Sequence, residues 1–277
     1  MAVGKRGVAW VSTFICFAVA KHAGRDARVP AFEIMEPTTI LIILAIFIVA
    51  VLYSSVGHGG ASGYLAVMAI MSVAPEITRP TAFLLNVFVA TIASIQFIRA
   101  GYFSWRLFWP FALGAVPVVF LAAFIHLPTT VYKIVFGVVL ILAALRLAWN
   151  LKAGTEIKMP PIWLSIVIGA LIGLLSGLVG VGGGIFLTPV LLLMNWSETK
   201  KAAGVSAMFI LVNSLAGIAG NYAQVMALQS SVWIWIAAAV VGGVFGSTLG
   251  AKRFDSLMMR RVLAVVLLFA GVKLIFV

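Results

Sequence analysis

The stretch Val179-Gly180-Val181-Gly182-Gly183-Gly184-Ile185-Phe186-Leu187-Thr188-Pro189 places four glycines among five consecutive residues inside a long apolar region. Glycine holds a helix poorly, so one helix is expected to end in this stretch and another to begin just after it. An earlier stretch, Val56-Gly57-His58-Gly59-Gly60, agrees with residues 179–183 at four of five positions. The chain therefore contains two copies of one pattern.

The composition is that of a membrane protein. Hydrophobic residues make up 64% of the chain, charged residues only 9%, and the mean hydropathy is +1.19. No soluble domain of 277 residues has this composition, which leaves the lipid bilayer as its surroundings. The single cysteine, Cys16, excludes a disulfide framework, an iron–sulfur cluster and a thiolate metal site. We expect neither a metal nor another cofactor.

Ten hydrophobic segments follow one another from Thr38 onward. They cover residues 38–56, 61–74, 80–98, 107–125, 130–149, 162–179, 184–195, 203–224, 231–250 and 259–277. Two of them, 61–74 and 184–195, are shorter than a full crossing requires, and each follows a glycine cluster.

The ten segments divide into two halves of five, residues 36–150 and residues 151–277. In each half the glycine cluster leads to a short apolar segment, then to a turn with an acidic and then a basic residue, and then to a long helix. An odd number of crossings per half makes the two copies face opposite ways, as in many secondary transporters. The predicted fold class is an all-α polytopic membrane protein of two inverted repeats, each with a glycine-rich helix break.

Residues 1–35 are set apart from these repeats. Lys5 and Arg6 precede an apolar run that ends in Ala18-Val19-Ala20, as in a signal peptide. The alternative is a wrongly assigned N-terminal extension, with Met35 as the natural start. The sequence leaves both open.

The net charge of +12 does not indicate nucleic-acid binding, because the 19 Lys and Arg residues lie mostly where hydrophobic segments end. In the ten-segment arrangement, one side of the membrane receives eleven of them: Arg99, Arg106, Arg146, Lys152, Lys158, Lys200, Lys201, Lys252, Arg253, Arg260 and Arg261. The other side receives three: Arg79, Lys133 and Lys273. The positive-inside rule places the first group in the cytoplasm, and so predicts a multi-pass inner-membrane protein with both ends of its core outside.

The glycine clusters predict the binding site. A break frees backbone N–H and C=O groups, which are tolerated at membrane depth only where they are buried or line a cavity. The helix that begins after each break presents N–H groups and a positive dipole end, which favour an anion. Amide and hydroxyl side chains in the long helices add donors, with Asn86 aligned by eye opposite Ser206. The expected substrate-binding residues are Gly57, His58, Gly59, Gly60, Asn86, Gly180, Gly182, Gly183, Gly184, Ser206 and Asn213. Close helix packing through small residues is the alternative reading of the glycines.

His58 is the titratable residue that stands beside a glycine cluster. It would bind substrate, carry a proton, or simply bond to the broken backbone. All seven acidic residues lie in predicted loops or flanks, so a membrane-embedded carboxylate for ion coupling is not expected.

With these motifs the chain resembles the sulfite exporter TauE/SafE family of membrane transporters. The residues that carry the resemblance are Gly180 to Pro189, then Lys201-Ala202-Ala203-Gly204-Val205-Ser206, and the weaker first copy at residues 57–60. The resemblance covers residues 36–277 and implies transport of sulfite, an organosulfonate or a similar small anion. His58, Ala61 and Asn86 depart from the family's usual pattern and leave the substrate open.

The expected partners are a small anion and the bilayer, with homo-oligomerisation left open. The expected mechanism is alternating access at the paired helix starts. A passive anion channel is the nearest alternative, because the same breaks would line a pore. A membrane enzyme is less well supported, because His22, His58 and His126 are far apart in sequence and the helices carry no acids.

Overall fold

The structure, a computed structural model, describes residues 37–71, 73, 75–124, 141, 144–145 and 157–276. Residues 38–277 form one compact unit. Its described part consists of helices joined by short connections, with no strand. The helices are α2 (Pro37–Ser55), α3 (Ala61–Ile70), α4 (Pro75–Arg99), α5 (Trp105–Ala122), α7 (Ile162–Val179), α8 (Gly184–Leu193), α9 (Thr199–Gly220), α10 (Tyr222–Met226), α11 (Val232–Thr248), the π-helix η1 (Leu249–Arg253) and α12 (Ser256–Phe276).

These helices confirm the all-helical class, and nine of the ten expected segments coincide with a described helix to within a few residues. The tenth segment, 130–149, and the N-terminal stretch 1–35 lie outside the described residues, apart from positions 141, 144 and 145. In the described part, five helices are long and apolar enough to cross a membrane. The chain is therefore a multi-pass membrane protein.

Helices α3 and α8 are short, at 10 residues each. At 1.5 Å per residue such a helix spans about 15 Å, which is half of the roughly 30 Å hydrocarbon core. Both are almost completely buried by their neighbours. Each is therefore too short to cross the membrane alone and depends on the longer helices around it.

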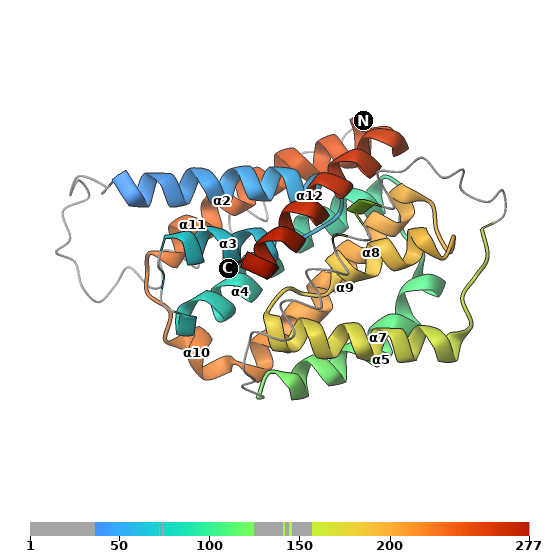
Figure 1. The fold of residues 1–277 in the computed structure, drawn as a ribbon, viewed down its shortest axis with the longest axis horizontal. Coiled ribbons are helices and arrows are strands. Elements are labelled where there is room, and N and C mark those ends of the chain that lie inside the picture. The colour runs from blue at the N-terminus through green and yellow to red at the C-terminus, as the bar shows by residue number, and fades with distance from the viewer. Residues whose placement is uncertain are drawn as a thin grey trace, which may run out of the picture. The chain divides into compact units, whose positions relative to one another are not determined.

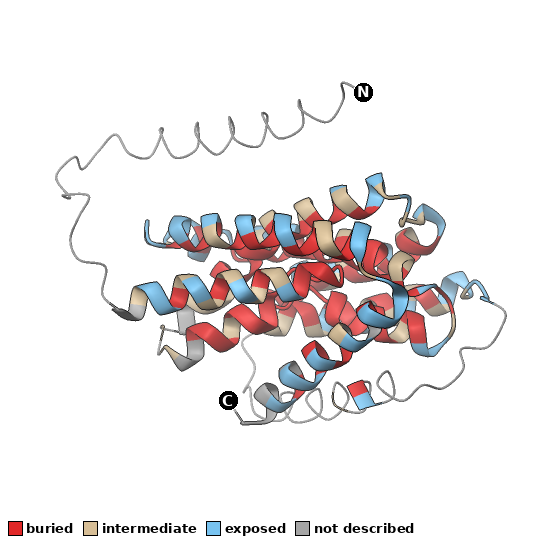
Figure 2. Cartoon of the chain, turned by 90° about the horizontal axis from the view of Figure 1, so that it is seen from above, coloured by how far each residue is buried: buried red, intermediate tan, exposed pale blue. Residues whose placement is uncertain are grey.

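The outer helices expose apolar side chains at helical spacing, which is the reverse of a soluble protein. On α2, Ile40, Leu44, Ile48 and Leu52 are all about half exposed, while the opposite face of the same helix is buried. Figure 2 shows the pattern for the unit: buried residues gather at its centre, and exposed ones cover the outward faces. Such faces are stable only against lipid.

Two pairs of helices approach each other through glycines. On α7, Gly169 and Gly173 lie against the backbone of α5 at Phe111 and Ala115. On α11 and η1, Gly242, Gly246 and Gly250 lie at four-residue intervals against the backbone of α2. Figure 1 shows both pairs running side by side. In each pair, a helix from one half of the sequence packs on a helix from the other half.

Helices α4 and α9 form the centre of the unit. They pack against each other, and α4 also contacts α3 and α11, while α9 contacts α5 and α8. The ring of Phe83 on α4 lies directly over Gly217 on α9. Asn86 and Asn213 come from these two helices, and both side chains are fully buried.

We expect Gly242→Ala to destabilise the protein and the neighbouring Gly243→Ala to be tolerated. A Cβ at residue 242 would lie 2.6 Å from the Phe47 carbonyl oxygen, whereas one at residue 243 would meet only the Val89 side chain, at 3.2 Å. Forced overpacking against backbone costs about 1–3 kcal/mol. Thermal unfolding of the two variants in detergent measures the difference, and equal midpoints would contradict the close α2–α11 contact.

Candidate functional site

The first glycine segment joins α2 to α3. After Ser55 the chain turns through Gly57, with φ of +77°, and Gly60, with φ of +98°, which is backbone that L side chains rarely adopt. The N–H of His58 donates to the Tyr53 carbonyl at 2.9 Å and holds the segment against the end of α2. The next helix then starts at Ala61 with all of residues 57–60 buried.

The second glycine segment joins α7 to α8. Gly180 ends α7 in the left-handed region, where its N–H donates to the Ser176 carbonyl at 2.8 Å. Gly182 and Gly183 also have positive φ, and the Gly183 carbonyl accepts the first hydrogen bonds of α8 at 3.1 Å. Residues 180–184 are all buried.

Asn86 connects the two segments. Its Oδ1 accepts from the Ala61 N–H, the first of α3, at 3.1 Å, and its Nδ2 donates to the Val181 carbonyl in the second segment at 3.4 Å. The first N–H groups of a helix and the carbonyls of a turn have no partner within the helix. Since the Asn86 side chain is fully buried, it satisfies one such group in each segment and ties the segments together.

Ile210 on α9 lies against the same two glycines as Asn86, Gly59 and Gly182. A Cβ at Gly59 would meet Asn86 and Ile210, and a Cβ at Gly182 would meet the same two side chains, within 3.0 Å in each case. Ile210 thus shares with Asn86 the contact with both glycine segments. The alignment of Asn86 with Ser206 stays a prediction. No sequence signal marks an isoleucine as a site residue.

Asn213 and Ser206 lie on the α8 side. Asn213 donates to the Gly182 carbonyl at 3.4 Å, and its Oδ1 is buried with no hydrogen bond. Ser206 pairs with Thr188 on α8 at 2.7 Å. Of the other polar residues in the long helices, Thr91 bonds to its own helix and Gln96 to Thr248 on α11, which leaves these two outside the glycine segments.

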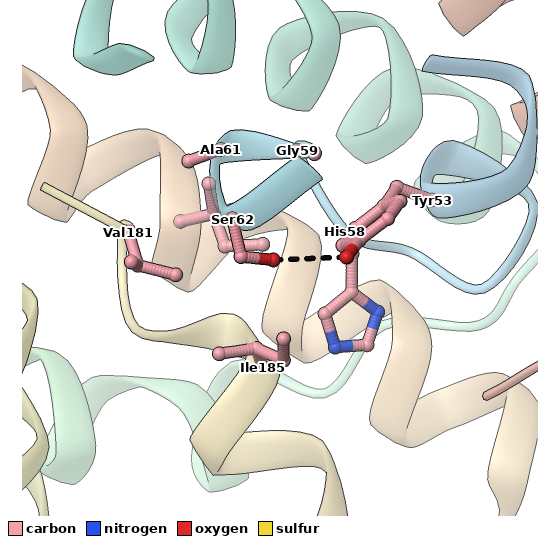
Figure 3. Close-up of a pocket in the computed structure, with 9 residues that line it drawn as sticks. Tyr53, His58, Gly59, Ala61, Ser62, Val181 and Ile185 are labelled. Atoms are coloured by element: carbon pink, nitrogen blue, oxygen red, sulfur yellow. Dashed lines mark hydrogen bonds between the residues drawn. The ribbon is translucent and has the colours of Figure 1, made fainter. Parts of the chain in front are cut away.

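A small pocket opens beside the first segment. Its cavity volume is about 10 Å³, which is room for about one water molecule. Its lining residues are Tyr53, His58, Gly59, Gly60, Ala61, Ser62, Val181, Ile185 and Ile210. Both glycine segments and the first turn of α3 therefore contribute, and none of the lining side chains carries a fixed charge. Figure 3 shows the Ser62 hydroxyl bonded to Tyr53, with the His58 ring nearby.

Arg79 lies at the start of the second glycine segment, beside Gly180. Its guanidinium donates to the carbonyls of Ala122 and Gly177, at the ends of α5 and α7, and its side chain lies against Gly180. The sequence marked Arg79 only as a loop cation. Within the described residues, no group of three or more His, Cys, Asp or Glu side chains comes together to hold a metal ion.

The expected site residues fall into one neighbourhood, but not into one cavity. His58, Gly59 and Gly60 line the pocket, Asn86 and Gly182 meet beside it, and Gly183 and Asn213 meet on its α8 side. Gly57 packs on Ala203 and Gly180 on Arg79, which are roles in helix packing. Tyr53 and Ser62 join the pocket although sequence reasoning did not single them out.

Known proteins similar to this chain are membrane transporters by name. The chain is 36% identical to the probable membrane transporter protein y4hK of Sinorhizobium fredii, over 87% of this chain and all of that protein. It is 24% identical to the probable membrane transporter protein YunE of Bacillus subtilis, over 86% and 97% of the two chains. It is 28% identical to the probable membrane transporter protein MJ0441 of Methanocaldococcus jannaschii, over 68% and 73%. No solved structure matches the chain.

The sequence profile of one family, described as sulfite exporter TauE/SafE, matches residues 42–274. That range takes in every described helix that contributes to the glycine segments, the pocket and the central amides. The chain therefore belongs to the sulfite exporter TauE/SafE family of membrane transporters.

Proposed function

We propose that the chain carries a small anion, sulfite or an organosulfonate, across the bilayer by alternating access. The anion would be held between the starts of α3 and α8. The observation that carries the proposal is the Asn86 side chain, which bonds to the Ala61 N–H on one side and to the Val181 carbonyl on the other. A single amide thus spans both helix breaks at the point where two positive dipole ends approach each other.

The proposed inverted repeat is supported by the way the helices pair. Helix α7 of the second half packs through glycines on α5 of the first, and α11 of the second half packs through glycines on α2 of the first. Helices α2 and α7 each precede a glycine segment, and α5 and α11 each follow the long central helix of their half. Matching roles in the two pairs are what a two-fold relation between the halves requires.

The substrate class is supported by the chemistry of the neighbourhood. Backbone N–H groups, hydroxyls and amides suit oxygen atoms that carry negative charge. The pocket has room for about one water molecule, so an anion would enter only after the helices around it moved apart, as alternating access requires. In the proposed orientation, the side with eleven basic residues is the cytoplasmic side of the inner membrane. Those charges would concentrate anions there.

Purified protein in liposomes is expected to move labelled sulfite or a sulfonate such as methanesulfonate, and to leave acetate behind. Preloading the vesicles with unlabelled anion should accelerate uptake of the label, because a carrier exchanges and returns with its substrate. Flux without such counterflow would identify a channel, and absence of flux for sulfite, thiosulfate and sulfonates would refute the proposed function.

Substitutions of Asn86 test the central contact. Asn86→Ala removes the two hydrogen bonds that tie the segments together, each worth about 0.5–1.5 kcal/mol of stability, so the segments should be held less firmly and anion binding should weaken. Asn86→Asp keeps the acceptor for the Ala61 N–H but adds a negative charge, and should abolish anion transport. Labelled-anion binding and counterflow in liposomes measure both effects.

Asn221→Ala is the matched control, because Asn221 is also a buried asparagine but bonds only to Gly217 of its own helix, at 2.8 Å. It should transport at the wild-type rate. If Asn86→Asp moved anions as well as this control does, the anion would not lie between the two segments.

A further inference from the structure

His58 presents an unpaired acceptor to the pocket. Its side chain is 1% exposed, and its Nδ1 lies 3.1 Å from the Val56 carbonyl oxygen. A carbonyl oxygen can only accept a hydrogen bond, so Nδ1 must carry a proton. In the neutral ring the other nitrogen, Nε2, then holds a lone pair, and within the described residues it makes no hydrogen bond.

The pocket that His58 lines also holds proton donors. The Tyr53 hydroxyl accepts from Ser62 at 2.9 Å, which leaves its own proton for a ligand. The first turn of α3 contributes backbone N–H groups, one of which is held by Asn86. Figure 3 shows the Tyr53 hydroxyl above the His58 ring and the Ile185 side chain to one side of the ring.

The pocket has no cation to balance an anion, because none of its nine lining residues is a lysine or arginine. An isolated buried anion costs many kcal/mol, and an anion facing the Nε2 lone pair would also be repelled. A proton removes both difficulties. It turns Nε2 into a donor, or it arrives on the ligand and is donated to Nε2.

We propose that this site binds an oxyanion together with one proton, so that the transported unit is an anion and a proton. This rests on the proposed function and specifies its substrate. In one form of the complex, His58 takes a proton from water at Nε2 and becomes imidazolium, which donates to the anion. In the other, an acid oxyanion such as hydrogensulfite brings the proton and donates it in a hydrogen bond to Nε2. Charge and atoms balance identically in both forms.

Few other groups in the neighbourhood can titrate. Tyr53 on α2 lines the pocket and Tyr64 on α3 lies against Gly60, while α8 and α9 present Ile185 and Ile210 to it. The tyrosines are acids that stay protonated near neutral pH. His58 is therefore the group in this part of the described chain that can change its charge there.

Calorimetry on the whole purified protein tests the proposal through proton uptake. Binding is measured at about pH 8, where an ordinary imidazole is neutral, in two buffers with different ionisation enthalpies. The probes are methanesulfonate, which cannot carry a proton at this pH, and sulfite, which is then largely a dianion. Wild-type protein should take up about one proton per anion bound. Affinity should rise as the pH falls, by up to about tenfold per pH unit.

Two variants locate the proton. His58→Gln places an amide near the Nε2 position but cannot titrate, and His58→Asn keeps the donor toward Val56 while removing Nε2. If the proton sits on His58, both should bind methanesulfonate much more weakly than wild-type protein does, and any binding that remains should show no proton uptake and no pH dependence. Sulfite uptake that survives in His58→Gln, with no methanesulfonate binding to any form, would place the proton on the ligand and also support the proposal.

Ser165→Ala on α7, a buried hydroxyl that bonds to Pro161 at 3.1 Å, is the control and should retain full uptake. Anion binding by wild-type protein with no proton uptake for either probe would overturn the inference, with water then occupying the place beside Nε2. That result would leave the proposed function standing, whereas absence of counterflow for every anion would refute the proposed function itself.

Discussion

An unpaired backbone N–H or carbonyl group in an apolar environment costs several kcal/mol, and this constraint governs the centre of the molecule. Two helices end and two begin among buried residues, so at each break the chain must find partners for several backbone groups. Local turns pair some of these backbone groups, such as the N–H groups of His58 and Gly180. Asn86 pairs others from α4, with one bond in each segment. Placing the breaks therefore also fixes α4 and α9 between them.

The two glycine segments are contacted by different kinds of side chain. Asn86 reaches both, while the side chain that faces it from α9 is Ile210, which offers no hydrogen bond. Asn213 bonds only to Gly182, and its Oδ1 stays unpaired. The first segment supplies three of the nine residues that line the pocket, His58, Gly59 and Gly60, and the second segment supplies Val181. Two halves with similar sequence patterns thus produce a centre in which an asparagine from α4 faces an isoleucine from α9.

Much of the helical framework could be predicted from the sequence, because apolar runs and glycine clusters are local signals. The expected short segment 184–195 is α8, Gly184–Leu193, and the expected segment 162–179 is α7 to the residue. The inverted relation of the halves stays a prediction supported by the helix pairs. Several contacts could not be predicted: Ile210 against Gly182, Gln96 with Thr248, and Arg79 on the carbonyl ends of α5 and α7. Each joins residues far apart in the chain, and such pairings depend on how helices cross.

The glycine faces on α7 and α11 also affect how the helices can move. Side chains normally form ridges that lock into the grooves of a neighbouring helix, so a shift of one helix requires many rotamers to change together. Where Gly242, Gly246 and Gly250 lie on the backbone of α2, there are no ridges on the glycine side. A small translation along that contact changes few rotamers and keeps the two backbones equally close. The close contact between α2 and α11 is thus also one that offers little resistance to sliding.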